Sequence, residues 1–244
     1  MGTAIVITSG KGGTGKTSVT GGVAAALAQM GRSVLCIDMD IGLRNLDISL
    51  GLNDRALMDF SDVAQGRCPL SRAAVQHPLL PGLFLLTAPM SLSPTLTKSH
   101  VRALLDTART YYDYVLIDCP AGLGSGFQLA TCAADRALVV ATSDATSLRD
   151  AQRTVGELAH IRHVHLVMNR IQPKLLRRLR TTIDDAMDSA GLPLMGVVPE
   201  DPQVMLSANL GQPLILGKHQ GAAIACANIA KRLDGQRVPI MRIR

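Results

Sequence analysis

The sequence predicts an α/β protein, a single domain built on a mostly parallel sheet with helices on both faces. Short runs rich in β-branched residues alternate with helical patterns along the 244 residues. Most of these runs are apolar at consecutive positions, as expected of strands that are buried on both faces. Strands and helices that alternate in this way form parallel sheets through crossover connections. No linker, repeat or low-complexity tract divides the chain, so we expect one domain over residues 1–234 and a short basic tail over residues 235–244.

The expected strands follow one another between turn residues. They are residues 4–8, 33–38, 83–87, 114–118, 136–142, 163–168 and 194–198. Helices are expected where apolar residues recur at intervals of three and four. The clearest helical patterns are Val23, Ala24, Leu27 and Ala28; Leu148, Ala151, Val155, Leu158 and Ala159; and Ala222, Cys226, Ile229, Ala230 and Leu233. Prolines 89, 94, 173 and 202 stand between the elements, where they interrupt no ladder of hydrogen bonds.

Composition narrows the class of protein. The formal net charge of +6 is compatible with an anionic partner, whether nucleotide, membrane or nucleic acid. Aromatic residues make up only 2% and Trp is absent, so the core must be aliphatic and base stacking is disfavoured. The five cysteines form no C-x-x-C pair, which indicates a reducing compartment rather than a disulfide framework or zinc site. We expect neither a membrane span nor a secretory signal.

The first motif is GKGGTGKT, residues 10–17, which fits the phosphate-loop pattern G-x-x-x-x-G-K-[ST]. Glycines allow backbone N–H groups to face an anion closely, and the N-terminus of the following helix favours negative charge. Lys16 is expected to meet the outer phosphates and Thr17 to ligate Mg²⁺. A strand before the motif and a helix after it disfavour a chance match. The motif therefore predicts a P-loop NTPase, and it leaves an additional lysine, Lys11, to be explained.

Two further segments place carboxylates at strand ends. VLCIDMDIGLRNLD, residues 34–47, brings Asp38 and Asp40 to the carboxyl end of a buried strand, where open parallel sheets bind ligands. They are either solvated loop acids or groups that orient an attacking water and the waters of Mg²⁺. YDYVLIDCPAGLGSG, residues 112–126, ends a strand in Asp118, which suits a water-mediated Mg²⁺ contact. Gly122, Gly124 and Gly126 then form either an ordinary turn or a segment that switches with the γ-phosphate.

Together the three segments resemble the MinD/ParA group of ATPases, whose phosphate loop K-G-G-x-G-K-T carries an extra lysine. DIGLRNLD (40–47) resembles the septum-placement branch of that group more than the partition branch or the flagellar-number relatives. The same branch is resembled by SLRDAQR (147–153), MNR (168–170) and GVVPED (196–201). The resemblance covers residues 1 to about 234. It implies ATP hydrolysis with ATP or ADP and Mg²⁺ as ligands.

The resemblance also implies a role for each site residue. Lys11 would reach across a homodimer to the partner's ATP, Lys16 would hold the phosphates, and Asp40 would position the attacking water. Thr17, Asp38 and Asp118 would hold Mg²⁺, the two carboxylates through its waters. Asn169 would contact adenine, beside a base pocket of Pro199, Glu200 and Asp201. The implied nucleotide-binding loop residues are Gly10, Lys11, Gly12, Gly13, Thr14, Gly15, Lys16, Thr17 and Ser18.

By the same resemblance the protein would dimerise with ATP and act in division-site placement, with MinE-like or MinC-like activator or inhibitor partners. It would be cytoplasmic or peripheral at the inner face of the cell membrane. Two alternatives stay open. One is a ParA-like partition ATPase that binds DNA non-specifically, and the other is a soluble adaptor that binds only proteins.

The chain departs from the group in two places. Gly124 occupies a position that is acidic in many members, so the segment after Asp118 is expected to behave differently. The tail RLDGQRVPIMRIR is interrupted by Pro239, which disfavours the basic amphipathic helix with which the septum-placement branch usually ends. The tail is therefore either a frayed basic end or a weak lipid contact. Its basic and apolar residues are Arg237, Ile240, Met241, Arg242, Ile243 and Arg244.

Two weaker features remain. PKLLRRLR, residues 173–180, concentrates positive charge and is either a solvated cationic face or a contact to a phosphate backbone. Its leucines, Leu175, Leu176 and Leu179, resemble the buried stripe of a helix. HIRHVH, residues 160–165, places His163 and His165 on one strand face, but no Cys or carboxylate lies close by to complete a metal site.

Overall fold

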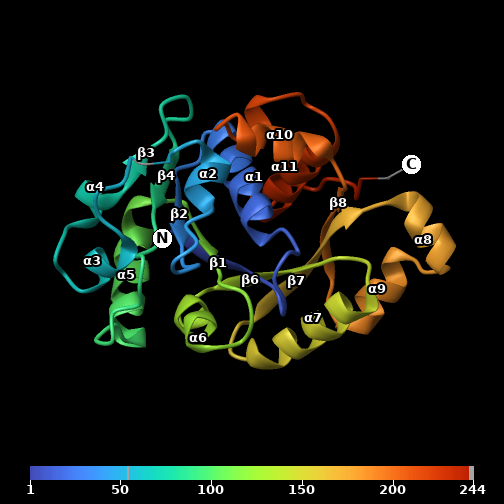
Figure 1. The fold of residues 1–244 in the computed structure, drawn as a ribbon, viewed down its shortest axis with the longest axis horizontal. Coiled ribbons are helices and arrows are strands. Elements are labelled where there is room, and N and C mark those ends of the chain that lie inside the picture. The colour runs from blue at the N-terminus through green and yellow to red at the C-terminus, as the bar shows by residue number, and fades with distance from the viewer. Residues whose placement is uncertain (54, 242–244) are drawn as a thin grey trace.

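The computed structural model describes residues 1–53 and 55–241, and it confirms the predicted mostly parallel sheet with helices on both faces (Figure 1). Eight strands form one sheet in the order β3-β4-β2-β5-β1-β6-β7-β8. The strands are β1 (Thr3–Thr8), β2 (Val34–Asp38), β3 (Val75–Gln76), β4 (Leu83–Leu86), β5 (Tyr114–Asp118), β6 (Arg136–Ala141), β7 (His163–Ile171) and β8 (Leu194–Pro199). Every pairing is parallel except that of β3 with β4.

The helices cover both faces of this sheet. They are α1 (Lys16–Gln29), α2 (Leu46–Leu50), α3 (Phe60–Ala64), α4 (Leu70–Ala73), α5 (Lys98–Tyr111), α6 (Ser125–Thr131), α7 (Ala145–Glu157), α8 (Pro173–Leu179), α9 (Ile183–Ala190), α10 (Pro202–Asn209), the 3₁₀ turn η1 (Leu214–Leu216) and α11 (Gly221–Leu233). Figure 1 shows α1 beside α11 and α10 on one side of the sheet, and α5, α6 and α7 on the other.

Strand β1 lies in the middle of the sheet, between β5 and β6, because the chain crosses over in both directions from it. Its alternate side chains enter two aliphatic cores. Val6 belongs to the core under α5, α6 and α7, whereas Ile5 and Ile7 belong to the core under α1 and α11. Burial on both faces explains the run of consecutive apolar residues. The loop after β1 therefore emerges at the topological switch point, where parallel sheets bind ligands.

The sequence missed β3 because two residues carry no readable alternation. Strand β7 is also longer than expected: it runs on to Ile171, past the predicted end at residue 168. Its pairing with β8 shifts register between Met168 and Ile171. A bulge of this kind re-aims the residues that it contains, and here those residues are Asn169 and Arg170, with Arg170 at a positive φ of 56°.

Candidate functional site

The phosphate loop joins the end of β1 to the start of α1. Within the described part of the chain, the N–H groups of residues 12–18 donate to no protein acceptor. Gly15 stands immediately before α1 with φ 86°, a conformation that favours glycine. A Cβ atom at Gly15 would meet the Asn169 amide nitrogen at 2.3 Å. Free N–H groups that converge at a helix N-terminus form an anion site, so the loop fits a phosphate chain.

The first turns of α1 connect this loop to β5. Lys16 is 7% exposed at the base of the loop. Thr17 donates its hydroxyl to Asp118 Oδ2 at 2.6 Å, and Thr20 donates its hydroxyl to Asp118 Oδ1 at 3.2 Å. The structure therefore brings together Lys16, Thr17 and Asp118, as predicted. Thr20 was missed, although its spacing of three from Thr17 places it on the same helix face.

Two buried carboxylates end neighbouring strands, because Asp38 on β2 is paired in register with Asp118 on β5. Burial raises the pKa of Asp38 to about 6, although the N–H groups of Asp40 and Leu46, which donate to its carboxylate, act to lower it. Burial, followed by repulsion from Asp38, raises the pKa of Asp118 to about 7. Carboxylates that resist ionisation together favour a cation between them. With Thr17 they form a donor set of hard oxygens that fits Mg²⁺.

Asp40 follows this pair at the mouth of the site. Burial raises the pKa of its half-buried carboxyl, and the positive charge of Lys16 acts in the opposite direction. Its backbone carbonyl accepts from the N–H groups of Leu43 and Arg44, which closes a turn. A carboxylate held beside the phosphate lysine, yet open to solvent, is placed to orient a water molecule.

Lys11 does not lie with Lys16. Its ammonium donates to Asp144 Oδ1 at 2.8 Å and to Thr146 Oγ1 at 3.0 Å, at the start of α7. Asp144 is the N-cap of α7 and accepts from the Ser147 N–H at 2.9 Å. Partial burial favours a higher pKa for Asp144, but hydrogen bonds, the one from Lys11 foremost, hold it well below its usual range. The two lysines of the loop therefore occupy separate places, one buried and one at the rim.

A cavity of about 410 Å³ opens next to the loop, between the ends of β7 and β8 and helices α10, α11 and α1. The predicted base-pocket residues Asn169, Pro199, Glu200 and Asp201 all line it, together with Gly13, Gly15 and Ser18. Apolar side chains from α10 and α11 form much of its wall, among them Val204, Met205 and Cys226. An apolar cavity with a few polar groups beside an anion-binding loop has the character of a nucleotide-base site.

The polar groups of this cavity also make structural bonds that the sequence did not reveal. Asn169 donates its amide to the Thr14 carbonyl at 2.7 Å, and so anchors the phosphate loop to β7. Asp201 accepts from the N–H groups of Gln203 and Ala222, both at 2.9 Å, and ties together the starts of α10 and α11. Glu200 is paired with Arg170 at 2.9 Å. The cavity wall is therefore braced before any ligand enters.

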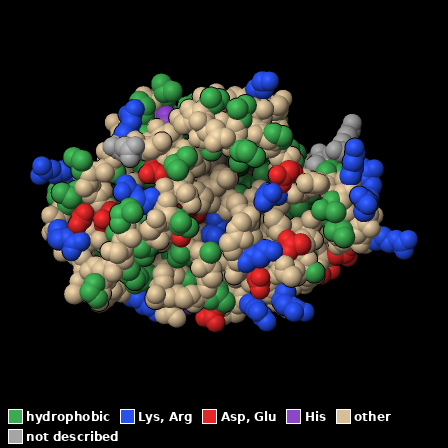
Figure 2. Space-filling view, in the orientation of Figure 1, with side chains coloured by type: hydrophobic (Ala, Val, Ile, Leu, Met, Phe, Trp, Pro, Cys, Tyr) green, Lys and Arg blue, Asp and Glu red, His purple; other side chains and the backbone are tan. Residues whose placement is uncertain are grey.

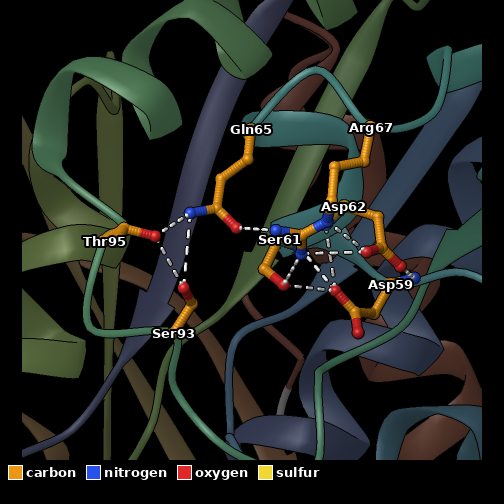
Figure 3. Close-up of polar contacts among 7 residues, drawn as sticks. All are labelled: Asp59, Ser61, Asp62, Gln65, Arg67, Ser93 and Thr95. Carbon is orange, nitrogen blue, oxygen red and sulfur yellow. Dashed lines mark hydrogen bonds and ion pairs between the residues drawn. The ribbon is translucent and has the colours of Figure 1, made fainter.

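A second polar network joins α3 to the loop that follows β4 (Figure 3). Asp59 caps α3 by accepting from the N–H groups of Ser61 and Asp62. Gln65 reaches the loop that follows β4, donating to Thr95 Oγ1 at 2.6 Å and to Ser93 Oγ at 3.3 Å. In the same loop the Pro89 carbonyl accepts from the Gly42 N–H at 3.2 Å. The turn that carries Asp40 is thus braced from the β4 side.

The remaining sequence features differ from expectation in one respect. No residue of α8 is buried, so the prediction that Leu175, Leu176 and Leu179 form a buried stripe was wrong. Of the three leucines only Leu176 packs against the core, because this seven-residue helix extends beyond the sheet.

All five cysteines are free. Within residues 1–53 and 55–241, neither a cluster of three potential metal ligands of the His, Cys, Asp or Glu type nor a helix able to cross a bilayer is present.

The tail lies against the body as far as it is described. Arg232 donates to the carbonyl oxygens of Val238 and Pro239 at 2.9 and 2.5 Å, and Met241 packs against the core of α1 and α11. Ile240 remains 40% exposed. Arg242, Ile243 and Arg244, which belong to the predicted basic tail, lie outside the described residues.

Comparison with known proteins agrees with this geometry. Residues 5–214 match the family model of the CobQ/CobB/MinD/ParA nucleotide binding domain. The chain is 38% identical over 242 residues to the septum site-determining protein MinD of Synechocystis, covering 97% of this chain and 91% of that protein. Its fold is similar to MinD in the MinC:MinD cell division complex of Aquifex aeolicus (TM-score 0.88, 37% identity, 98% of both chains). It is also similar to MinD complexed with Mg-ADP from Pyrococcus horikoshii (TM-score 0.83, 29% identity, 96% of both chains).

Proposed function

This chain belongs to the CobQ/CobB/MinD/ParA nucleotide-binding family and is an ATPase, and from that premise we propose that it acts as an ATP-dependent dimerisation switch in division-site placement. The resemblance that the sequence suggested, to the septum-placement branch of the group, is confirmed. In the proposed cycle ATP and Mg²⁺ favour a homodimer, the dimer binds membrane or partner proteins, and hydrolysis releases it.

The observation that carries the proposal is the separation of the two loop lysines. Lys16 is buried under its own phosphate site, whereas Lys11 lies at the rim in an ion pair whose side chains are 35% and 48% exposed. An exposed ion pair contributes little, so Lys11 is free to exchange Asp144 for a stronger anion. In a second copy facing this rim, that anion is the partner's triphosphate. A cation supplied in trans stabilises the charge of the phosphoryl group in transfer.

The inner site supplies the remaining groups. Lys16 and the free N–H groups of residues 12–18 bind the phosphates, and Asp40 orients the attacking water. Thr17, Asp38 and Asp118 would hold Mg²⁺, which would neutralise charge on the phosphate oxygens. Asn169 and residues 199–201 border the base. A relative holds Mg-ADP, which supports both ligands.

The partners are proposed from the relatives. MinD of Aquifex aeolicus forms a complex with MinC, which supports a MinC-like inhibitor for this chain, and we propose a MinE-like activator beside it. We place the protein in the cytoplasm and at the inner face of the cell membrane. Arg237 and the exposed Ile240 are the part of the described tail that is available for weak lipid contact.

The test is the mass of the particle in solution. Asp40→Ala is expected to bind ATP and dimerise while hydrolysing about a hundredfold more slowly, because it lacks the group that orients water. Light scattering on this variant should give twice the monomer mass with ATP and Mg²⁺, and the monomer mass with ADP or no nucleotide. Equal masses in all three conditions would refute the switch. Wild-type turnover by Asp40→Ala would remove that residue from the mechanism.

The exposed cations of α8 favour one alternative, a ParA-like partition ATPase. Its signature is an ATP-dependent shift of random-sequence DNA that weakens steeply with salt, because bound phosphates release counterions. Binding of neither DNA nor anionic vesicles, together with retained dimerisation, would favour the adaptor that binds only proteins.

A further inference from the structure

Helix α8 carries a concentration of positive charge on the surface of the molecule. None of its seven residues is buried. Leu175 is 40% and Leu179 51% exposed, and the two stand on the same short helix as the cations. Figure 2 shows Lys and Arg side chains, with hydrophobic side chains among them, at the end of the molecule where Figure 1 places α8. A solvated cationic face explains the charges, but it does not require two exposed leucines beside them on the same helix.

Residues at both ends and one contact with the core support the helix in spite of its exposure. Pro173 occupies its first turn, and Arg180 ends it in the left-handed conformation, with φ 53°. The N–H of Thr181 donates to the Leu176 carbonyl at 3.2 Å, and the Leu176 side chain packs against the core. Tertiary anchoring replaces the length that an isolated helix would need. Its outer face is therefore already formed before it meets a partner.

Helical spacing sorts this outer face into two stripes. Lys174 and Arg178 are four residues apart, as are Leu175 and Leu179, so a cationic stripe lies next to an apolar one. Lys174, Arg177, Arg178 and Arg180 make no ion pair within the described part of the chain. Unpaired cations beside exposed leucines complement a surface that offers anions over hydrocarbon.

A hollow of about 350 Å³ lies at the foot of the cationic stripe. Lys174 and Arg177 line it, opposite Pro199 at the end of β8. Glu200 also borders the hollow, but Arg170 pairs with its carboxylate at 2.9 Å. Two unpaired cations therefore face this space against one compensated acid, which suits a phosphate group.

We propose that α8 is a docking surface for anionic phospholipid. Lys174, Arg177 and Arg178 contact headgroup phosphates, while Leu175 and Leu179 enter the acyl boundary. Duplex DNA is the poorer occupant, because a phosphate backbone has no use for two leucines flanking the cations. Asp184, Asp185 and Asp188 on α9 limit the attraction, so one copy binds weakly and two copies in a dimer bind by avidity. The inference rests on the membrane-binding part of the proposed function.

The same segment borders the nucleotide site. Helix α8 begins two residues after the end of β7, where Asn169 holds the Thr14 carbonyl and Arg170 donates to the Gly13 carbonyl at 3.4 Å. A lipid surface at α8 and a nucleotide in the cavity therefore act on one continuous stretch of chain.

The experiment is co-sedimentation of the full chain with vesicles of phosphatidylcholine containing phosphatidylglycerol. We expect Lys174→Gln/Arg177→Gln/Arg178→Gln to lower the partition coefficient on the order of a hundredfold, since each cation near an anionic surface adds to binding. The matched control Arg72→Gln/Lys98→Gln/Arg162→Gln removes the same charge from exposed positions elsewhere and should change it by less than about threefold. Leu175→Ser/Leu179→Ser should lower it about tenfold, and its control Leu57→Ser/Leu79→Ser should not.

Each other outcome counts against the proposal. If the partition coefficient fell equally in both charge variants, α8 would contribute only through the net charge of the protein. A second contrary result is a leucine variant that sediments with vesicles as the wild type does while the α8 cations bind random-sequence DNA. That result would make nucleic acid, and not lipid, the partner of α8. No sedimentation of the wild type would overturn the lipid surface outright. Lys11→Ala, which the switch requires to stay monomeric, should still show the α8-dependent partition, so failure of the switch and failure of this surface remain distinct.

Discussion

The interior of the nucleotide site and its rim each contain a lysine and an aspartate, but in opposite physical settings. Inside, Lys16 is 7% and Asp118 1% exposed, and Asp118 is bonded to two hydroxyl groups of α1. At the rim, Lys11 and Asp144 form a direct ion pair at 2.8 Å with both side chains substantially exposed. Burial raises the pKa of Asp118, whereas hydrogen bonds from Lys11 and its neighbours, outweighing partial burial, lower that of Asp144.

The difference separates what the chain does alone from what it does in a pair. The interior is fixed by strand ends and the first turns of α1, so it is organised for the chain's own nucleotide. The rim pair is screened by water and is readily exchanged. We therefore expect interior changes to act on nucleotide binding and stability, and rim changes to act on dimerisation.

The largest expected effect is at the rim. Lys11→Ala should leave ATP affinity nearly unchanged while ATP-dependent dimerisation is lost and hydrolysis falls about a thousandfold, as when a cation supplied in trans is removed. Nucleotide affinity by calorimetry, particle mass by light scattering and phosphate release together check it. If Lys11→Ala still dimerised with ATP, the rim lysine would not serve dimerisation, and the functional contrast between rim and interior would be wrong.

The next effect is in the interior. Lys16→Ala should weaken ATP binding about a hundredfold, because a buried charge-assisted contact to phosphate is lost. Calorimetric titration measures the loss, and circular dichroism verifies that the fold persists. Unaltered affinity would show that the buried lysine does not hold the phosphates.

The pH dependence of stability sharpens the contrast further. In the folded protein the pKa of Asp118 is raised to about 7 and that of Asp38 to about 6, above the value of 3.8 in the unfolded chain. The folded state therefore binds these protons more tightly, and the free energy of unfolding rises as pH falls from about 7 towards 4. Urea unfolding of the nucleotide-free wild type should show a rise of about 6 kcal/mol in the free energy of unfolding between pH 7 and pH 4, and Asp118→Asn should show a rise of only about 2 kcal/mol. Parallel pH curves would contradict it.

The smallest effect is expected from the acidic member of the rim pair. Asp144→Asn keeps a good helix cap but removes the charge that holds Lys11, so ATP-dependent dimerisation should tighten by no more than about fivefold. Asp150→Asn, at another acidic position of α7, serves as the control. Weaker dimerisation of Asp144→Asn would mean that the pair helps rather than competes with the second copy.

The sequence predicted every strand except β3, because consecutive apolar residues mark strands that lie between two helical layers. It failed at α8, where helical spacing of leucines suggested burial. Spacing shows that side chains share a helix face, but not whether anything covers that face. The sheet ends at β8, and α8 extends past it.

For the site, motif spacing predicted Lys16, Thr17, Asp38 and Asp118, which the structure places together. Asp144 could not be predicted as the partner of Lys11, since the two are 133 residues apart and only the parallel order of β1 and β6 joins them. The bonds of Asn169 to Thr14 and of Asp201 to two helix starts were also missed. Their roles depend on backbone groups, which leave no trace in residue types.

The two borders of the sheet are both blunt. At one border β3 offers only two residues, antiparallel to the rest. At the other, Arg232 donates to the Met195 carbonyl of β8 at 2.9 Å. An outer strand with little free backbone is a poor template for another strand. Edge-to-edge pairing of copies into fibres is therefore disfavoured. Self-association is expected instead at the rim of the nucleotide site, where the bound nucleotide controls it.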